Sequence, residues 1–144
     1  MKYVYDIYIF ILIQDRHMSG YIQNIEQETL QNENFRKVVY TWTHMQLVVM
    51  SLQPQEEIGL EVHHHEDQFI RVEQGEGKAI LWDQEHHIAH DIALIIPAGM
   101  KHNVINTSTT ETLKLYTIYA PSHHPENTIH VTKKEADEAE EHHH

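Results

Sequence analysis

The chain has 144 residues, about the length of one domain, and contains 22 acidic against 10 basic residues, for a formal net charge of −12. No basic patch interrupts this acidic excess, which disfavours nucleic acid and anionic membranes as partners. Because the chain has no cysteine, disulfides and thiolate metal sites are excluded, and any metal must use imidazole, carboxylate or amide groups.

Residues 1–17 form an extension ahead of the domain, which we expect to span residues 18–130. The apolar run from Tyr3 to Ile13 is roughly half the ~20 residues that cross a bilayer, and it lacks the features of a signal peptide. We therefore expect a cytoplasmic protein with no membrane partner. The β-branched and aromatic bias predicts an added strand or a dimer contact. The alternative is a non-native stretch ahead of a start at Met18.

The middle of the chain consists of short segments with the period of two that is typical of half-buried strands. They cover residues 38–40, 45–52, 68–73, 78–82, 92–96, 102–106 and 113–119. Turn-forming residues separate them at 53–55, 75–77, 83–85 and 97–99. Evenly spaced strands with no long helical stretch between them predict an all-β sandwich or barrel.

After the last of these strands the chain is expected to leave the sheet. Residues 120–130 form a loop bounded by prolines, in which His123 and His124 could close the mouth of a cavity, although placement at the surface is favoured. Residues 131–144 form a charged, helix-permissive C-terminal tail. Its final three histidines, 142–144, look like the remnant of an affinity tag, so they are excluded from any site.

The stretch from Asp91 to Asn106 carries a distinctive motif. Pro97, Gly99, His102 and Asn106 follow one another as Pro-x-Gly-x-x-His-x-x-x-Asn. This spacing resembles the second motif of the small single-domain cupins, with Asp91 in place of its opening glycine. The resemblance implies an all-β double-stranded β-helix, or jelly-roll, barrel that binds a metal through His102.

The first cupin motif fits the chain in a single register. Counting back from Gly75 puts Gln68 at the family's glutamate, His63 at its second histidine and Glu61 at its first. Counting forward from Gln55 reaches Glu61 again. Glu61 and His63 would also point to one face of an extended strand.

The resemblance therefore implies a mononuclear divalent metal site formed by Glu61, His63, Gln68 and His102. A usual member of the family offers three imidazoles and one carboxylate, so here the carboxylate has moved and an amide replaces it. Such ligands suit Zn, Fe, Mn, Ni or Co, and the identity of the metal stays open. His65 is the alternative to His63 or Gln68 if the intervening turn is one residue shorter.

Strand parity also predicts which other polar side chains avoid the interior. Arg71 is expected to point outward, to an interface or an ion pair, and Lys101 also points outward. We therefore expect no inward cationic residue that could bind a phosphate. Gln46 and Met50 could face the interior, where a plain core is favoured.

The ligand set suggests three functions. It resembles that of the zinc-dependent mannose-6-phosphate isomerases, which are also cupins, so the first is an isomerase-like protein acting on a sugar or another small oxygenated molecule. The alternatives are a metal-dependent dioxygenase and a non-catalytic module that binds a small molecule. An exposed edge of the jelly roll predicts a homodimer.

Overall fold

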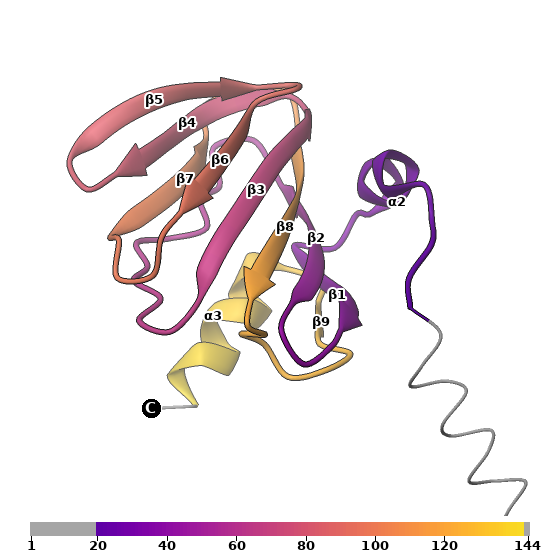
Figure 1. Cartoon of the computed structure of the whole chain (residues 1–144). Helices are drawn as coiled ribbons and strands as arrows, with labels where there is room; N and C mark the ends of the chain where they lie inside the picture. Colours follow the sequence, from indigo (N-terminus) through magenta and orange to yellow (C-terminus); the bar gives the residue numbers. More distant parts are fainter. Residues whose placement is uncertain (1–19, 143–144) are drawn as a thin grey trace, which may run out of the picture.

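The computed structural model describes residues 20–142, which form two facing antiparallel sheets and two helices (Figure 1). The strands are β1 (Arg36–Thr41), β2 (Gln46–Leu52), β3 (Asp67–Gln74), β4 (Glu76–Leu81), β5 (Gln84–Ala89), β6 (Ala93–Ile96), β7 (His102–Asn106), β8 (Leu113–Ala120) and β9 (Ile129–His130). The sheet orders are β6-β3-β8-β2-β1-β9 and β5-β4-β7. The predicted all-β jelly roll is confirmed, and the prediction for residues 1–17 lies outside the described residues.

The inner face of the six-stranded sheet is polar at one end and apolar beyond it. One cross-strand row contains Gln46, Tyr119, Gln68 and Ile96 in register. The next two rows are formed by Val48, Thr117, Ile70 and Leu94, and by Met50, Leu115 and Val72. Because residues paired across strands share a face, the apolar rows form the core and the polar row marks one end of the barrel.

Strand β5 was not predicted, because the sequence suggested a turn at residues 83–85. The turn lies earlier, at Trp82, which has a φ of 58° in the left-handed region. Four exposed residues begin β5, and Ile88 is its only fully buried side chain. A strand with one apolar contact to the core lacks the alternation on which the prediction depends.

Helix α2 (Ile25–Gln31) packs on the outer side of the larger sheet and was also not predicted. The side chain of Asn24 caps its N-terminus by accepting a hydrogen bond from the backbone of Gln27. At the other end the ammonium group of Lys114, on β8, donates to the carbonyl oxygens of Leu30 and Asn32 at 2.7 and 3.0 Å. These contacts satisfy a lysine side chain that is only 5% exposed.

Helix α3 (Lys133–Glu141) occupies most of the expected C-terminal tail and begins at Thr132, whose side chain caps it. Ala136 is 1% exposed and belongs to the same core cluster as the strands. Figure 1 shows this helix beside the end of the larger sheet that carries β1 and β9. Among residues 20–142, neither helix has the length and apolar character needed to cross a bilayer.

Candidate metal centre

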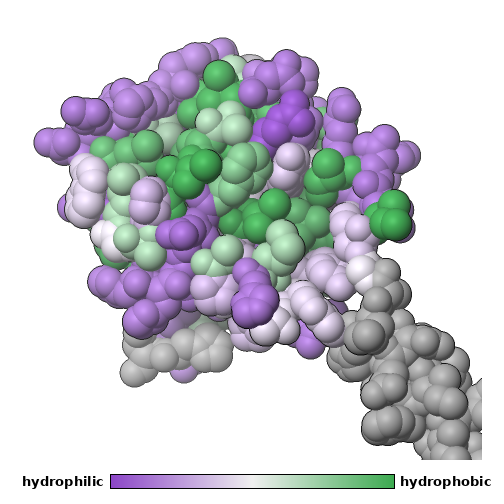
Figure 2. Space-filling view, viewed as in Figure 1, coloured by the Kyte–Doolittle hydropathy of each residue, from purple (hydrophilic) through white to green (hydrophobic). Residues whose placement is uncertain are grey.

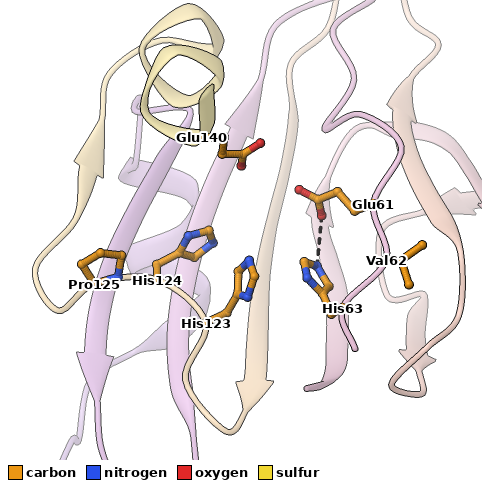
Figure 3. Close-up of a pocket in the computed structure, with 7 residues that line it drawn as sticks. All are labelled: Glu61, Val62, His63, His123, His124, Pro125 and Glu140. Atoms are coloured by element: carbon orange, nitrogen blue, oxygen red, sulfur yellow. Dashed lines mark hydrogen bonds and ion pairs between the residues drawn. The ribbon is translucent and has the colours of Figure 1, made fainter. Parts of the chain in front are cut away.

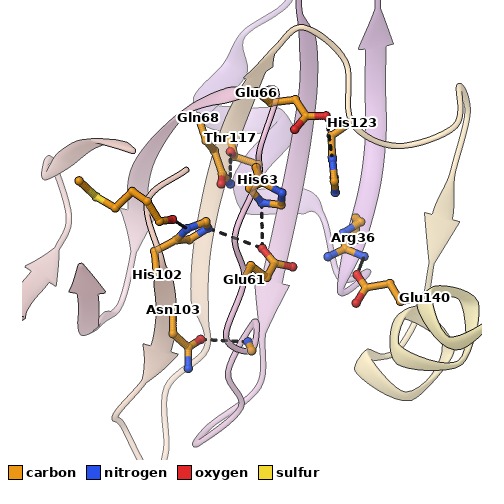
Figure 4. A network of polar contacts seen from close by, with 12 residues as sticks. Arg36, Glu61, His63, Glu66, Gln68, His102, Asn103, Thr117, His123 and Glu140 are labelled. Carbon is orange, nitrogen blue, oxygen red and sulfur yellow. Dashed lines mark hydrogen bonds and ion pairs between the residues drawn. The ribbon is translucent and has the colours of Figure 1, made fainter. Parts of the chain in front are cut away.

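Two segments that are distant in sequence bring Glu61 and His63 next to His102 (Figure 4). The backbones of Glu61 and His102 exchange two hydrogen bonds, of 2.9 and 3.0 Å, so residue 61 extends the smaller sheet beyond β7. The carbonyl oxygen of His63 accepts a hydrogen bond from the backbone of Gly99 at 2.8 Å. The two predicted motifs therefore run side by side.

The side chains of Glu61, His63 and His102 form a compact cluster. Oε2 of Glu61 lies 3.1 Å from Nε2 of His63 and 3.7 Å from Nε2 of His102. The three potential ligand atoms all lie within 4.8 Å of one another. His63 and His102 are buried and Glu61 is half-buried, so one carboxylate and two imidazoles converge in a site largely shielded from solvent.

A backbone contact fixes the orientation of His102. Its Nδ1 lies 2.8 Å from the carbonyl oxygen of Met100, and since a carbonyl can only accept, Nδ1 carries the hydrogen and donates it. In the neutral ring Nε2 then carries a lone pair. This atom is buried and has no hydrogen-bond partner within residues 20–142, because 3.7 Å to Glu61 is too long for a hydrogen bond. A donated Nδ1 hydrogen with a free Nε2 is the usual arrangement of a metal-binding histidine.

Opposing effects set the charges in the cluster. Burial alone would raise the pKa of the Glu61 carboxyl group, but contacts with His102 and His63 outweigh it and hold this pKa well below its usual range. Burial would lower the pKa of His102, but Glu61 and the Met100 carbonyl outweigh it and raise this pKa. A proton on His102 therefore competes with any cation that binds to the cluster.

Gln68 lies in the polar row of β3 with its amide held in one orientation. Its Nε2 donates a hydrogen bond of 3.0 Å to Oγ1 of Thr117, while its Oε1 is buried and has no hydrogen-bond partner among the described residues. The oxygen is therefore free to accept a further contact. The alternative residue, His65, is exposed and lies outside both groups of potential metal ligands, which are Glu61, His63 and His102 and, sharing His63, Glu66 and His123.

A cavity of about 500 Å³ opens beside the cluster (Figure 3). It is lined by Glu61, Val62, His63, His123, His124, Pro125 and Glu140. The rings of His123 and His63 are 4.3 Å apart, and Nδ1 of His123 lies 3.3 Å from Oε1 of Glu66. The two loop histidines therefore line the cavity; His124 is half-buried there, whereas His123 is also exposed at its mouth, so the expected surface placement is correct for His123.

Gln46 holds these loop histidines in place. Its Oε1 accepts hydrogen bonds from the backbone nitrogens of His123 and His124 at 3.2 and 2.9 Å. Its Nε2 donates to the carbonyl oxygen of His124 at 2.8 Å and to Oγ1 of Thr41 at 3.0 Å. The expectation of a plain core is correct for Met50 but wrong for Gln46, which is fully buried and serves as a polar anchor.

Arg36 contradicts the expectation that no cationic side chain faces inward. It is 1% exposed and lies opposite Met50 in the register of β1 and β2. Its Nη1 is 3.4 Å from Oε1 of Glu140 on α3. Arg71, by contrast, forms the expected ion pair, at 2.7 Å with Asp91. The position of Arg36 on the inner face could have been found by extending the strand parity one residue pair before Val38.

Comparison with known proteins identifies the class to which this jelly roll and its histidine cluster belong. The family described as "Cupin domain" matches residues 48–119, half of the chain. The chain belongs to the cupin family. The expected domain boundaries and the mannose-6-phosphate isomerase-like subtype stay predictions.

Three relatives are similar over most of the chain. "Uncharacterized protein YrkC" of Bacillus subtilis is 43% identical over 91% of this chain and 73% of its own length. "Uncharacterized protein L612" of Acanthamoeba polyphaga mimivirus is 43% identical over 81% of this chain and 74% of its own. The crystal structure of BH2720 from Bacillus halodurans is 44% identical, with a TM-score of 0.80 over 83% of this chain and 94% of that one.

Proposed function

We propose that this cupin binds one divalent metal ion through Glu61, His63 and His102, with the Gln68 amide oxygen as a weaker fourth ligand. The observation that carries the proposal is the buried Nε2 of His102, which lies among the other ligand atoms and has no hydrogen-bond partner within residues 20–142. Two imidazoles with oxygen ligands suit Zn, Fe, Mn, Ni or Co.

The donor set also supports a catalytic rather than a purely structural site. Three strong protein ligands leave coordination positions open, and the adjoining cavity of about 500 Å³ has the size of a small-molecule site. When bound, the ion would polarise a carbonyl or hydroxyl oxygen of that molecule. His63 and Glu61, which line both the cluster and the cavity, would orient the molecule.

We propose an isomerase-like reaction on a sugar or another small oxygenated molecule as the first candidate. The second candidate, a metal-dependent dioxygenase, is favoured by the combination of two imidazoles and one carboxylate, a set that binds iron(II). Oxygen uptake by the iron-loaded protein across a panel of diols and enols would distinguish them. An isomerase would interconvert aldoses and ketoses without consuming oxygen. NMR of the product mixture would detect the newly formed sugar.

Metal content tests the site itself. The chain without residues 142–144 should carry about one metal ion per molecule by elemental analysis, and His102→Ala should lose most of it. The matched control is His86→Ala, which removes an exposed histidine on β5 and should retain the metal. If the metal content of the parent protein stays at the background level after incubation with each candidate ion, the proposed site is refuted.

We also propose that two copies pair through the outer face of the larger sheet. Ile95, Phe69, Ile118 and Leu47 form one apolar row across β6, β3, β8 and β2. Figure 2 shows apolar side chains gathered on this face, and Ile95 is 68% exposed. Ile95→Glu should give a monomer in light scattering, whereas Trp82→Glu, at an exposed site on the turn between β4 and β5 of the smaller sheet, should not. The cytoplasmic location also stays a prediction.

A further inference from the structure

Arg36 is a buried cation whose hydrogen-bonding capacity is largely unused. A guanidinium group has five N–H donors in a planar fork. Here the Nη1 contact with Oε1 of Glu140 is 3.4 Å long, and Nε is buried with no hydrogen-bond partner among the described residues. The ring of Phe35 lies 5.6 Å from the guanidinium carbon. A buried charge with so few partners is costly for folding, which suggests that a partner is supplied from outside the chain.

The backbone of Arg36 lies beside Met50 in the apolar rows, and its guanidinium group extends to Glu140 at the edge of the cavity. Figure 4 shows it between the carboxylates of Glu61 and Glu140. Glu140, whose Oε1 lies 3.4 Å from Nη1 of Arg36, is one of the residues that line the cavity. An anion in the cavity would therefore come under the influence of this charge.

Glu140 is a weak partner that can leave. Its side chain is 51% exposed and projects from the last turn of α3, where a carboxylate is unfavourably placed at the negative end of the helix. The helix itself is anchored by the buried side chain of Ala136. Rotation of the Glu140 side chain would thus uncover Arg36 without moving α3.

We propose that Arg36 binds the carboxylate group of a small hydroxy or oxo acid in the cavity, and that the Glu140 carboxylate fills this position when the acid is absent. The planar fork of arginine matches a planar carboxylate, and the group beside it in the structure is already a carboxylate. A hydroxyl or carbonyl oxygen at the other end of such an acid would face Glu61 and His63. A small hydroxy or oxo acid would then be the substrate class of the metal site, and this assignment rests on the proposed metal-dependent function.

Binding to the metal-free full-length chain tests Arg36 separately from the metal. Glycolate and its neutral isostere glycolamide serve as probes in NMR titrations that follow the Nε–H signal of Arg36. Glycolate should shift this signal and glycolamide should not. Glu140→Gln should raise the affinity for glycolate about tenfold if Glu140 occupies the site about nine-tenths of the time. Glu138→Gln, on the same helix and similarly exposed, should leave the affinity unchanged.

Arg36→Lys in the Glu140→Gln background keeps the charge but removes the fork, so glycolate affinity should fall about tenfold or more. If this variant does not fold, the comparison of glycolate affinity between Glu140→Gln and Glu138→Gln still tests the role of Glu140. Equal affinities in those two variants, equal binding of glycolate and glycolamide, or tighter binding of inorganic phosphate than of glycolate would overturn the inference. His102→Ala should still bind glycolate, so a failure of the metal site alone leaves the anion site standing.

Discussion

Acidification is expected to destabilise the protein through His124. Burial first, then the nearby charges of Arg36 and His123, lower the pKa of this imidazole to about 2. In the unfolded chain the pKa is about 6.5, so between these values the unfolded state binds more protons than the folded state. The contribution of His124 to stability is therefore fully present above about pH 6.5 and decreases as the pH falls.

The size of the effect follows from the protonation of the unfolded chain alone. At pH 5 about 97% of unfolded molecules would carry a proton on this imidazole, whereas the folded imidazole stays neutral, which costs about 2 kcal/mol relative to pH 8. A folded pKa one unit higher gives nearly the same loss, because the folded ring is still neutral at pH 5. The prediction thus depends on the burial of His124 and little on the value of its pKa.

Urea unfolding at pH 8 and pH 5, followed by far-UV circular dichroism, measures this loss. His124→Gln cannot gain the proton, so acidification should cost it about 2 kcal/mol less than it costs the parent protein. Other titrating groups are shared by both proteins and largely cancel in the difference. His86→Gln, at an exposed position, should behave like the parent. Equal losses for the parent and His124→Gln would show that the ring accepts a proton in the folded state, and the reasoning would fail.

Three further substitutions test how the site and its supports are held. Gln46→Met removes four hydrogen bonds and should lower the free energy of unfolding by about 4 kcal/mol; a loss below about 1 kcal/mol would contradict the anchoring role. Lys114→Met leaves the last carbonyls of α2 without their donor and should speed hydrogen exchange in that helix; unchanged exchange would argue against it. Gly77→Ala places a Cβ against the carbonyl oxygen of Ile105, and the unfolding midpoint should fall by an amount equivalent to about 1–3 kcal/mol. An unchanged midpoint would mean that the strands shift freely.

The elements that the sequence predicts well are those with several side chains in the core. Strands β2, β3 and β8 each bury several side chains and were placed to within a residue or two. Strand β5 contributes only Ile88 to the core, and α2 has Thr29 as its one buried residue. Both elements are held mainly by partners elsewhere in the chain, through pairing with β4 and through Lys114. Elements held by such distant contacts carry little local hydrophobic pattern from which they could be predicted.

The same distinction explains which parts of the site were found. His102 and Glu61 belong to motifs whose spacing is fixed by local turns, so the residue spacing alone predicted that both lie at the same site. The half-buried position of His124 was not predicted because it depends on hydrogen bonds with Gln46, more than 70 residues away. Arg36 escaped notice because a charged residue at the start of a strand is normally exposed. Tertiary contacts, rather than local preference, place these residues.

The buried polar groups near the cavity include both acceptors and a donor that lack hydrogen-bond partners. Within residues 20–142, Nε2 of neutral His102 and Oε1 of Gln68 are buried acceptors without a hydrogen-bond partner, and Nε of Arg36 is a buried donor without one. Such groups weaken folding, and apolar side chains in their place would avoid the cost. A cation would satisfy the two acceptors and a carboxylate the donor. A metal ion and a small acid bound together would therefore satisfy all three of these atoms, the metal ion at His102 and Gln68 and the acid at Arg36.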